Sequence, residues 1–175
     1  MKQLLFSGLL LFTVTEINAQ RIVQSKFGDT LNNNWIGIDL TLSDSVYLSI
    51  KGPSILWFAL GFNTKHMQRG VDVLMVPAWK ESFRELMPFD AVLTGYAPPK
   101  RDDMEHWRVV SEEMKDGMRS FVLVRALATG DSNDFDFTNL SKNGGPLDII
   151  WAMGSEKENK TEYHGNQKGK RTLTF

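Results

Sequence analysis

The chain has 175 residues, of which 42% are hydrophobic and 23% are charged, and this composition is typical of a globular protein rather than a disordered or fibrous one. Twenty Lys and Arg against twenty-one Asp and Glu leave a net charge of -1, so no basic surface for nucleic acid or an anionic membrane is expected. The sequence contains no cysteine, which excludes disulfides, thiolate metal sites, a thiol nucleophile and attachment of a cofactor through sulfur.

Residues 1–19 have the pattern of a cleaved secretory signal peptide. Lys2 supplies a positive charge, and residues 4–14 are an apolar stretch. A membrane-spanning helix needs about 20 apolar residues, so this stretch is too short to be one. Asn18-Ala19 before Gln20 is a suitable cleavage site. We therefore predict a secreted protein, periplasmic or extracellular, with a single domain over residues 20–175 and no membrane span in the mature chain.

The mature chain is predicted to consist mainly of strands. Short apolar or alternating runs, enriched in β-branched and aromatic residues, are separated by turn residues. These runs cover residues 35–42, 45–51, 55–62, 71–76, 107–111, 119–126, 147–152 and 172–175. Runs of this length and spacing predict an all-β fold, an antiparallel sandwich or barrel. Residues 80–87 have helical character and predict at most one short helix.

Few polar residues form a pattern typical of catalysis. Residues 131–136 gather oxygen donors but lack the Gly and Glu of an EF-hand loop, which favours a solvated turn over a calcium site. Asp102, Asp103 and Glu105 precede His106 without a nucleophile beside them, so a solvent-exposed connector is expected there. Because no nucleophile, base and orienting group occur together, we do not expect a stand-alone enzyme.

Met67 and His164 lie in two glycine-containing loops, residues 64–70 and 163–169, each next to a predicted strand. A thioether and an imidazole offered from opposite sides of a pocket are ligands that a haem iron accepts. From the spacing alone, a packing role for the methionine and a surface role for the histidine are the more frequent outcomes.

Several short blocks occur in an order that resembles the DOMON domain. In chain order they are ILWFALGF at 55–62, Met67 followed by GVDVLMV at 70–76, Asp90, Gly95-Tyr96, Pro98-Pro99, Asp102, Trp107, RALATGD at 125–131, Asp134, IWAMG at 150–154, YHG at 163–165 and Lys168-Gly169. Modules of this family include the N-terminal region of dopamine β-monooxygenase and the cytochrome domain of cellobiose dehydrogenase. The resemblance implies a β-sandwich with immunoglobulin-like layering that binds either b-type haem or sugars.

The resemblance also implies which residues would hold the haem. Carried over from haem-binding members, the axial ligands correspond to Met67 and His164, of which His164 is the close match. Those members have one residue between the methionine and the following glycine, whereas Gln68 and Arg69 both intervene here, and a strict register would place Gln68 at the ligand position. His66 is an alternative second ligand.

Four further residues are candidates for the wall of the pocket, namely Trp57, Phe62, Met75 and Trp151. Haem b would bind noncovalently, because burial of its apolar face supplies the affinity. The chain ends on its last predicted strand, so the resemblance implies electron transfer to a separate redox partner protein, or sensing. The alternative is a haem-free sandwich that binds carbohydrate or another small ligand, since exposed aromatic rings stack on sugars.

Overall fold

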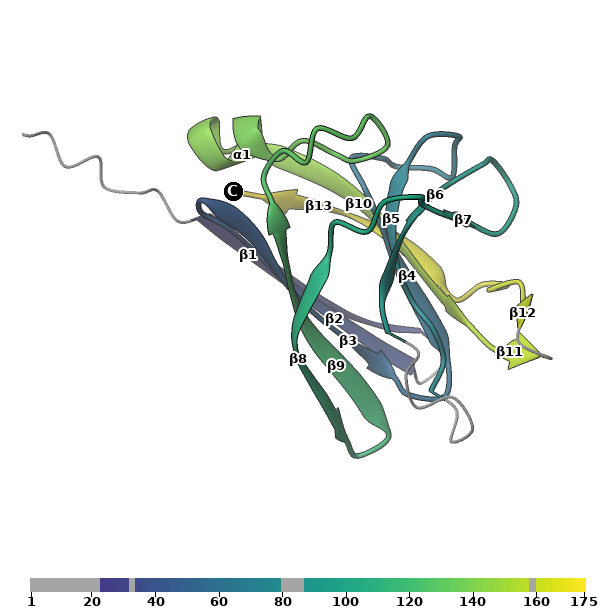
Figure 1. Cartoon of the computed structure of the whole chain (residues 1–175). Coiled ribbons are helices and arrows are strands. Elements are labelled where there is room, and N and C mark those ends of the chain that lie inside the picture. Colours follow the sequence, from purple (N-terminus) through teal and green to yellow (C-terminus); the bar gives the residue numbers. More distant parts are fainter. Residues whose placement is uncertain (1–22, 32–33, 80–86, 158–159) are drawn as a thin grey trace, which may run out of the picture.

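The computed structural model describes residues 23–31, 34–79, 87–157 and 160–175, which form two antiparallel sheets stacked face to face (Figure 1). The first sheet has the strand order β1-β2-β3-β9-β8. Its strands are β1 (Val23–Leu31), β2 (Asn34–Leu42), β3 (Ser45–Pro53), β8 (Arg108–Lys115) and β9 (Met118–Ala126).

The second sheet has the strand order β13-β10-β4-β5-β6-β7. Its strands are β4 (Trp57–Phe62), β5 (Asp72–Val76), β6 (Phe89–Val92), β7 (Lys100–Arg101), β10 (Pro146–Gly154) and β13 (Lys168–Thr174). A small ribbon of β11 (Glu156–Lys157) and β12 (Lys160–Thr161) projects beyond this sheet, and a short helix, α1 (Thr138–Asn143), packs near its other end (Figure 1).

The predicted all-β sandwich is confirmed, and each predicted strand has a counterpart in the two sheets. The sequence pattern did not predict β1, β6 or the two-residue strands β7, β11 and β12. The helix that the structure describes is α1, whereas residues 80–86 of the predicted helix lie outside the described residues, as do the predicted signal peptide and its expected cleavage site. Within the described ranges, no helix has the length and apolar character that a membrane span requires.

The main core lies between the two sheets and follows from the alternation of the strands. Every second residue of β2, from Ile36 to Leu42, is buried, as the period of two predicts. From the second sheet, Phe58, Leu60 and Phe62 of β4 face the same core. Burial of each such side chain contributes about 1.5–3 kcal/mol, so the apolar pattern fixes which face of each strand points inward.

The outer face of the second sheet is also apolar, although it is turned away from the first sheet. An outer cluster of buried residues covers it, made of Trp57, Ala59, Val71, Val73, Met75, Ala91 and Leu93. An antiparallel sheet with one solvated face would carry polar residues at these positions. Because β4 and β5 are buried on both faces, loops must cover the outer face, and these loops form the walls of a cavity.

Candidate functional site

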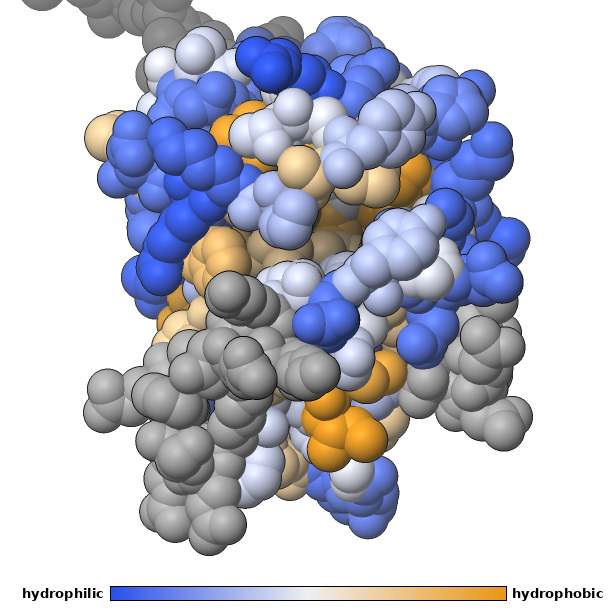
Figure 2. Space-filling model, turned by 90° about the vertical axis from the view of Figure 1, so that its right-hand side faces the viewer, coloured by the Kyte–Doolittle hydropathy of each residue, from blue (hydrophilic) through white to orange (hydrophobic). Residues whose placement is uncertain are grey.

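A cavity of about 770 Å³ lies on the outer face of the second sheet. Figure 2 looks onto this face, where apolar side chains lie at the bottom of a hollow and hydrophilic residues surround its mouth. Ala59 and Ala152 offer only methyl groups to the floor and Gly61 has no side chain, which leaves room above the sheet. The volume lies within the range of about 300–1,000 Å³ found for small-molecule and cofactor sites.

His164 enters this cavity from the turn that precedes β13 and is 8% exposed. Its Nδ1 lies 2.9 Å from the carbonyl oxygen of Gly165. A carbonyl can only accept, so Nδ1 carries the proton and donates, and Nε2 keeps its lone pair. Burial lowers the pKa of His164 below its usual 6.5, which keeps the imidazole neutral at pH 7. The ring is therefore a competent metal ligand.

Met67 reaches the same cavity from the loop between β4 and β5, where it packs against the outer cluster. The loop is fastened to β10 at two points. The backbone N–H of Thr64 donates to the carbonyl oxygen of Asp148 at 3.0 Å, and Lys65 Nζ lies 3.4 Å from Asp148 Oδ2. The structure thus brings Met67 and His164, which are far apart in the sequence, into the lining of one cavity.

The neighbours of Met67 divide between two cavities. His66 is exposed but also lines the large cavity, so it stays an alternative ligand. Gln68 instead lines a separate cavity of about 230 Å³. The residue that a strict register would place at the ligand position therefore does not line the cavity that contains His164.

Three of the four candidate wall residues line the large cavity, namely Trp57, Met75 and Trp151. Phe62 does not line it, and its assignment to the pocket wall is corrected. Phe62 lies on the inner face of β4, where its ring stacks at 6.0 Å on Trp107 within the core. The alternation of β4 explains the difference, because residues 57, 59 and 61 face outward and residue 62 faces inward.

Basic side chains gather at the mouth of the cavity, which the sequence analysis did not anticipate. Lys65, Lys168 and Lys170 line it together with Glu162. The alternation of β13 was the available signal, because it places two lysines on the outer face beside the histidine loop. Tyr163, next to His164, is 77% exposed at the same rim. The mouth can therefore receive negatively charged groups of a mainly apolar ligand.

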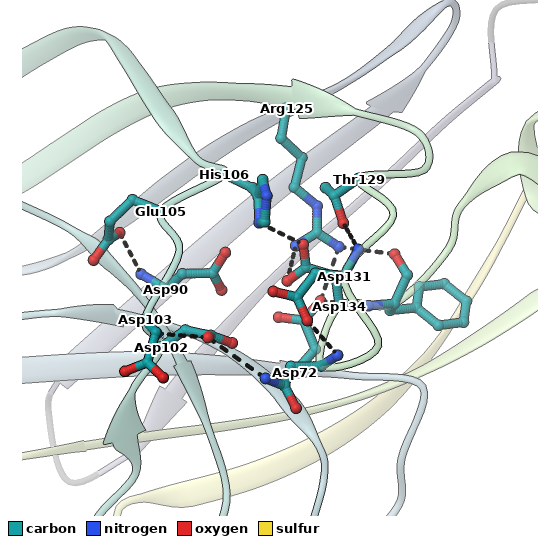
Figure 3. A network of polar contacts seen from close by, with 12 residues as sticks. Asp72, Asp90, Asp102, Asp103, Glu105, His106, Arg125, Thr129, Asp131 and Asp134 are labelled. Carbon is teal, nitrogen blue, oxygen red and sulfur yellow. Dashed lines mark hydrogen bonds and ion pairs between the residues drawn. The ribbon is translucent and has the colours of Figure 1, made fainter.

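A second polar centre is buried between the two sheets (Figure 3). Arg125 of β9 places its guanidinium 2.8 Å from Asp72 Oδ2 and 3.4 Å from Asp134 Oδ1. Burial raises the pKa of Asp72, and it raises the pKa of Asp90 to about 8, with the charges of Asp72 and Asp134 as further causes. The sequence analysis missed this centre, although Asp72 within an apolar run was a signal for it.

Two expectations about loops are modified by this centre. The turn expected at residues 131–136 is present, since the backbone N–H of Asn133 donates to Asp131 Oδ1 at 2.8 Å, but Asp134 points inward. The connector before β8 was expected to be exposed to solvent, and its residues Asp103 and Glu105 are exposed. His106 is not, because its Nδ1 lies 2.8 Å from Asp134 Oδ2 and its side chain is 18% exposed.

No family model matches the sequence, and no curated protein matches it either. Among solved structures, the cytochrome domain of Myriococcum thermophilum cellobiose dehydrogenase is similar, with a TM-score of 0.61 at 12% identity over 91% of this chain and 89% of that one. The cytochrome b domain of pyranose dehydrogenase from Coprinopsis cinerea is also similar, with a TM-score of 0.53 at 14% identity over 85% and 80%. The chain therefore has the fold of the DOMON-type cytochrome domains.

Proposed function

We propose that this protein is a secreted module that binds one b-type haem in the large cavity, with His164 and Met67 as axial ligands, and that it serves in electron transfer or sensing. The observation that carries the proposal is that a nitrogen donor and a sulfur donor line the same largely apolar cavity. Residues 1–19, with their signal-peptide pattern, motivate the secreted location.

The donor set fits a haem iron. A metal-ligating histidine commonly donates its other ring N–H to a carbonyl or carboxylate, and His164 already does so to Gly165. The thioether of Met67 is neutral at every pH, so neither ligand has to lose a charge on binding. Methionine and histidine ligation is found in electron-transfer cytochromes, where it raises the reduction potential.

The walls of the cavity fit the porphyrin ring of haem, and its mouth fits the propionate groups. Trp57, Met75 and Trp151 offer apolar surface to a porphyrin, whose burial supplies the affinity. The lysines at the mouth suit the two propionate carboxylates of haem. The likeness in fold to two cytochrome domains supports the same assignment.

Bound haem supplies a one-electron iron couple, which no amino-acid side chain of this cavity provides. With both axial positions taken by protein ligands, no iron position would be left for a substrate. We therefore infer a carrier or sensor that does not catalyse bond chemistry, and a redox partner on a separate protein.

Titration of the purified protein with haem, followed by visible absorption, tests the proposal. We expect a Soret band that saturates at one haem per chain, and His164→Ala should weaken binding at least about 10-fold. Gln68→Ala is the matched control, because Gln68 lines the other cavity. Absence of the band, or an unchanged band in His164→Ala, would refute haem binding. Heat on titration with sugars would then favour the carbohydrate-binding alternative.

A further inference from the structure

We propose that Asp90, His106 and Asp134 bind one divalent transition-metal ion, of which Zn²⁺ is the representative, at a site separate from the haem cavity. One ligand atom from each residue lies within 4.8 Å of the other two. Asp90 belongs to β6, His106 precedes β8, and Asp134 lies in the loop after β9 (Figure 3). Such an ion would join the two sheets of the sandwich.

Asp90 is the observation that points to a cation site. Its side chain faces the inside of the sandwich from β6, and the residue is 1% exposed. Neither carboxylate oxygen has a hydrogen-bond partner of good geometry among the described residues, although the backbone N–H of His106 lies close enough to lower the pKa of Asp90. A buried carboxylate without a side-chain donor is strongly unfavourable as an anion, so a cation that displaces its proton would find an uncommitted ligand here.

The backbone around Asp90 holds this arrangement in place. The Asp90 N–H donates to Glu105 Oε2 at 2.9 Å, and the Asp90 carbonyl accepts from the N–H of Asp102 at 3.0 Å. These two bonds fasten the segment before His106 to β6. The imidazole and the carboxylate are therefore held near each other by the chain itself, as a built metal site requires.

The charges around Asp90 are also compatible with a bound divalent ion. Three carboxylates, those of Asp72, Asp90 and Asp134, share this buried region with the guanidinium of Arg125. The guanidinium offsets one negative charge and is engaged with Asp72 and Asp134. Once Asp90 gives up its proton on binding, a divalent cation would offset the two negative charges that remain, and the region would be neutral.

The donor atoms select the kind of ion. One imidazole and two carboxylates suit Zn²⁺, which binds three protein ligands and a water at an open site. Ca²⁺ and Mg²⁺ prefer oxygen ligands throughout. The cavity of about 230 Å³ that Asp134 lines, together with Asp72 and Asn133, offers a route from solvent to the ligands.

Calorimetric titration of the chelator-washed, haem-free full chain with Zn²⁺ tests this site. We expect saturation at one ion per chain, a rise in Tm, and weaker binding of Ca²⁺ and Mg²⁺. Asp90→Asn and His106→Gln should each weaken Zn²⁺ binding at least about 10-fold and remove the rise in Tm. Asp90→Asn is expected to fold, because a neutral amide replaces a buried carboxylate of nearly the same shape.

Glu113→Gln is the matched control, since Glu113 is an exposed carboxylate of β8 outside the cluster, and it should keep the full affinity. His66 and His164 are intact in His106→Gln, so binding at the haem cavity would persist in that variant. Unchanged Zn²⁺ affinity in Asp90→Asn or in His106→Gln would overturn the proposal. Failure of Zn²⁺ to saturate the wild-type protein below millimolar concentration would overturn it as well.

Discussion

Arg125 of β9 and Asp72 of β5 form an ion pair between the two sheets, with 2.8 Å between the guanidinium and Asp72 Oδ2. The Arg125 side chain is fully buried and that of Asp72 is 3% exposed. The guanidinium also lies 4.7 Å from the ring centroid of Trp107, within cation–π distance. Polar and aromatic partners thus enclose one buried positive charge.

Removal of Arg125 should destabilise the fold severely. In Arg125→Met the carboxylates of Asp72 and Asp134 lose their buried cation, and such a loss costs about 3–5 kcal/mol. Denaturant unfolding would measure this difference in the free energy of unfolding. Arg108→Met, at an exposed arginine of β8, is the control and should stay within about 0.5 kcal/mol of the wild type. A similar small effect for Arg125→Met would contradict the structural role of the pair.

Gly169 should not tolerate a methyl group. A Cβ built at this position of β13 would lie 2.5 Å from the indole of Trp151, which lines the large cavity. Gly169→Ala must therefore displace the indole, and such overpacking costs about 1–3 kcal/mol in unfolding free energy. Thermal unfolding would measure the cost, and haem titration would measure the altered wall. In a Trp151→Leu background the same glycine substitution should cost much less, and an equal cost there would exclude the indole as its cause.

Acid should loosen the loop that carries Met67. The hydroxyl of Thr172 donates to Asp148 Oδ1 at 2.5 Å and lowers the pKa of Asp148 below its usual 3.8, and Lys65 lowers it further. Because the folded protein holds the proton less tightly than the unfolded chain, this contribution to stability is present above pH 3.8 and is lost as the pH falls through the folded-state pKa.

Asp148→Asn should therefore abolish this part of the acid dependence. The test compares unfolding free energies between about pH 5 and pH 3 for wild type and variant, with Asp103→Asn as the exposed control. NMR signals of the segment around Met67 should broaden or shift in acid in the wild type. An acid dependence that Asp148→Asn leaves intact would show that other carboxylates are responsible.

Three substitutions in the loop after β4 should identify the second haem ligand. Met67→Leu keeps the apolar volume but removes the sulfur donor, so the visible spectrum of the haem-loaded protein should change and haem should dissociate faster. His66→Gln should leave the spectrum unaltered, and so should Gln68→Ala, whose side chain lines the other cavity. The reverse pattern, a change in His66→Gln and none in Met67→Leu, would assign the ligand to the histidine.

The strands could be predicted from the sequence because their alternation records which face is buried. Strands were predicted correctly over residues 35–42 and 45–51, because one face of each strand packs in the core and the other face meets solvent. Strand β4 was harder to interpret, because both of its faces are buried and its sequence is apolar throughout. For that reason Phe62 of β4 was assigned to the pocket, whereas its register directs it to the core.

The buried polar centre could not be predicted, because its members lie on segments whose neighbourhood is set by the pairing of strands. His106 and Asp134 are each followed by aromatic residues, and each local sequence resembles an ordinary loop. Their contact follows from the antiparallel pairing of β8 with β9, which places the segment before β8 beside the segment after β9. In contrast, Met67 and His164 could be proposed as ligands from the sequence, but only through the resemblance to a family. Their spacing alone favoured a packing role for the methionine and a surface role for the histidine.

The pleat of β4 divides two tasks between alternate residues. Phe58 and Leu60 hold the sheets together, while Ala59 and Gly61 shape the floor of the large cavity. Selection on one set of positions can therefore act with little effect on the other. A related protein could therefore bind a different ligand through changes at the odd-numbered residues of β4, while the even-numbered residues of β4 preserved its thermal stability.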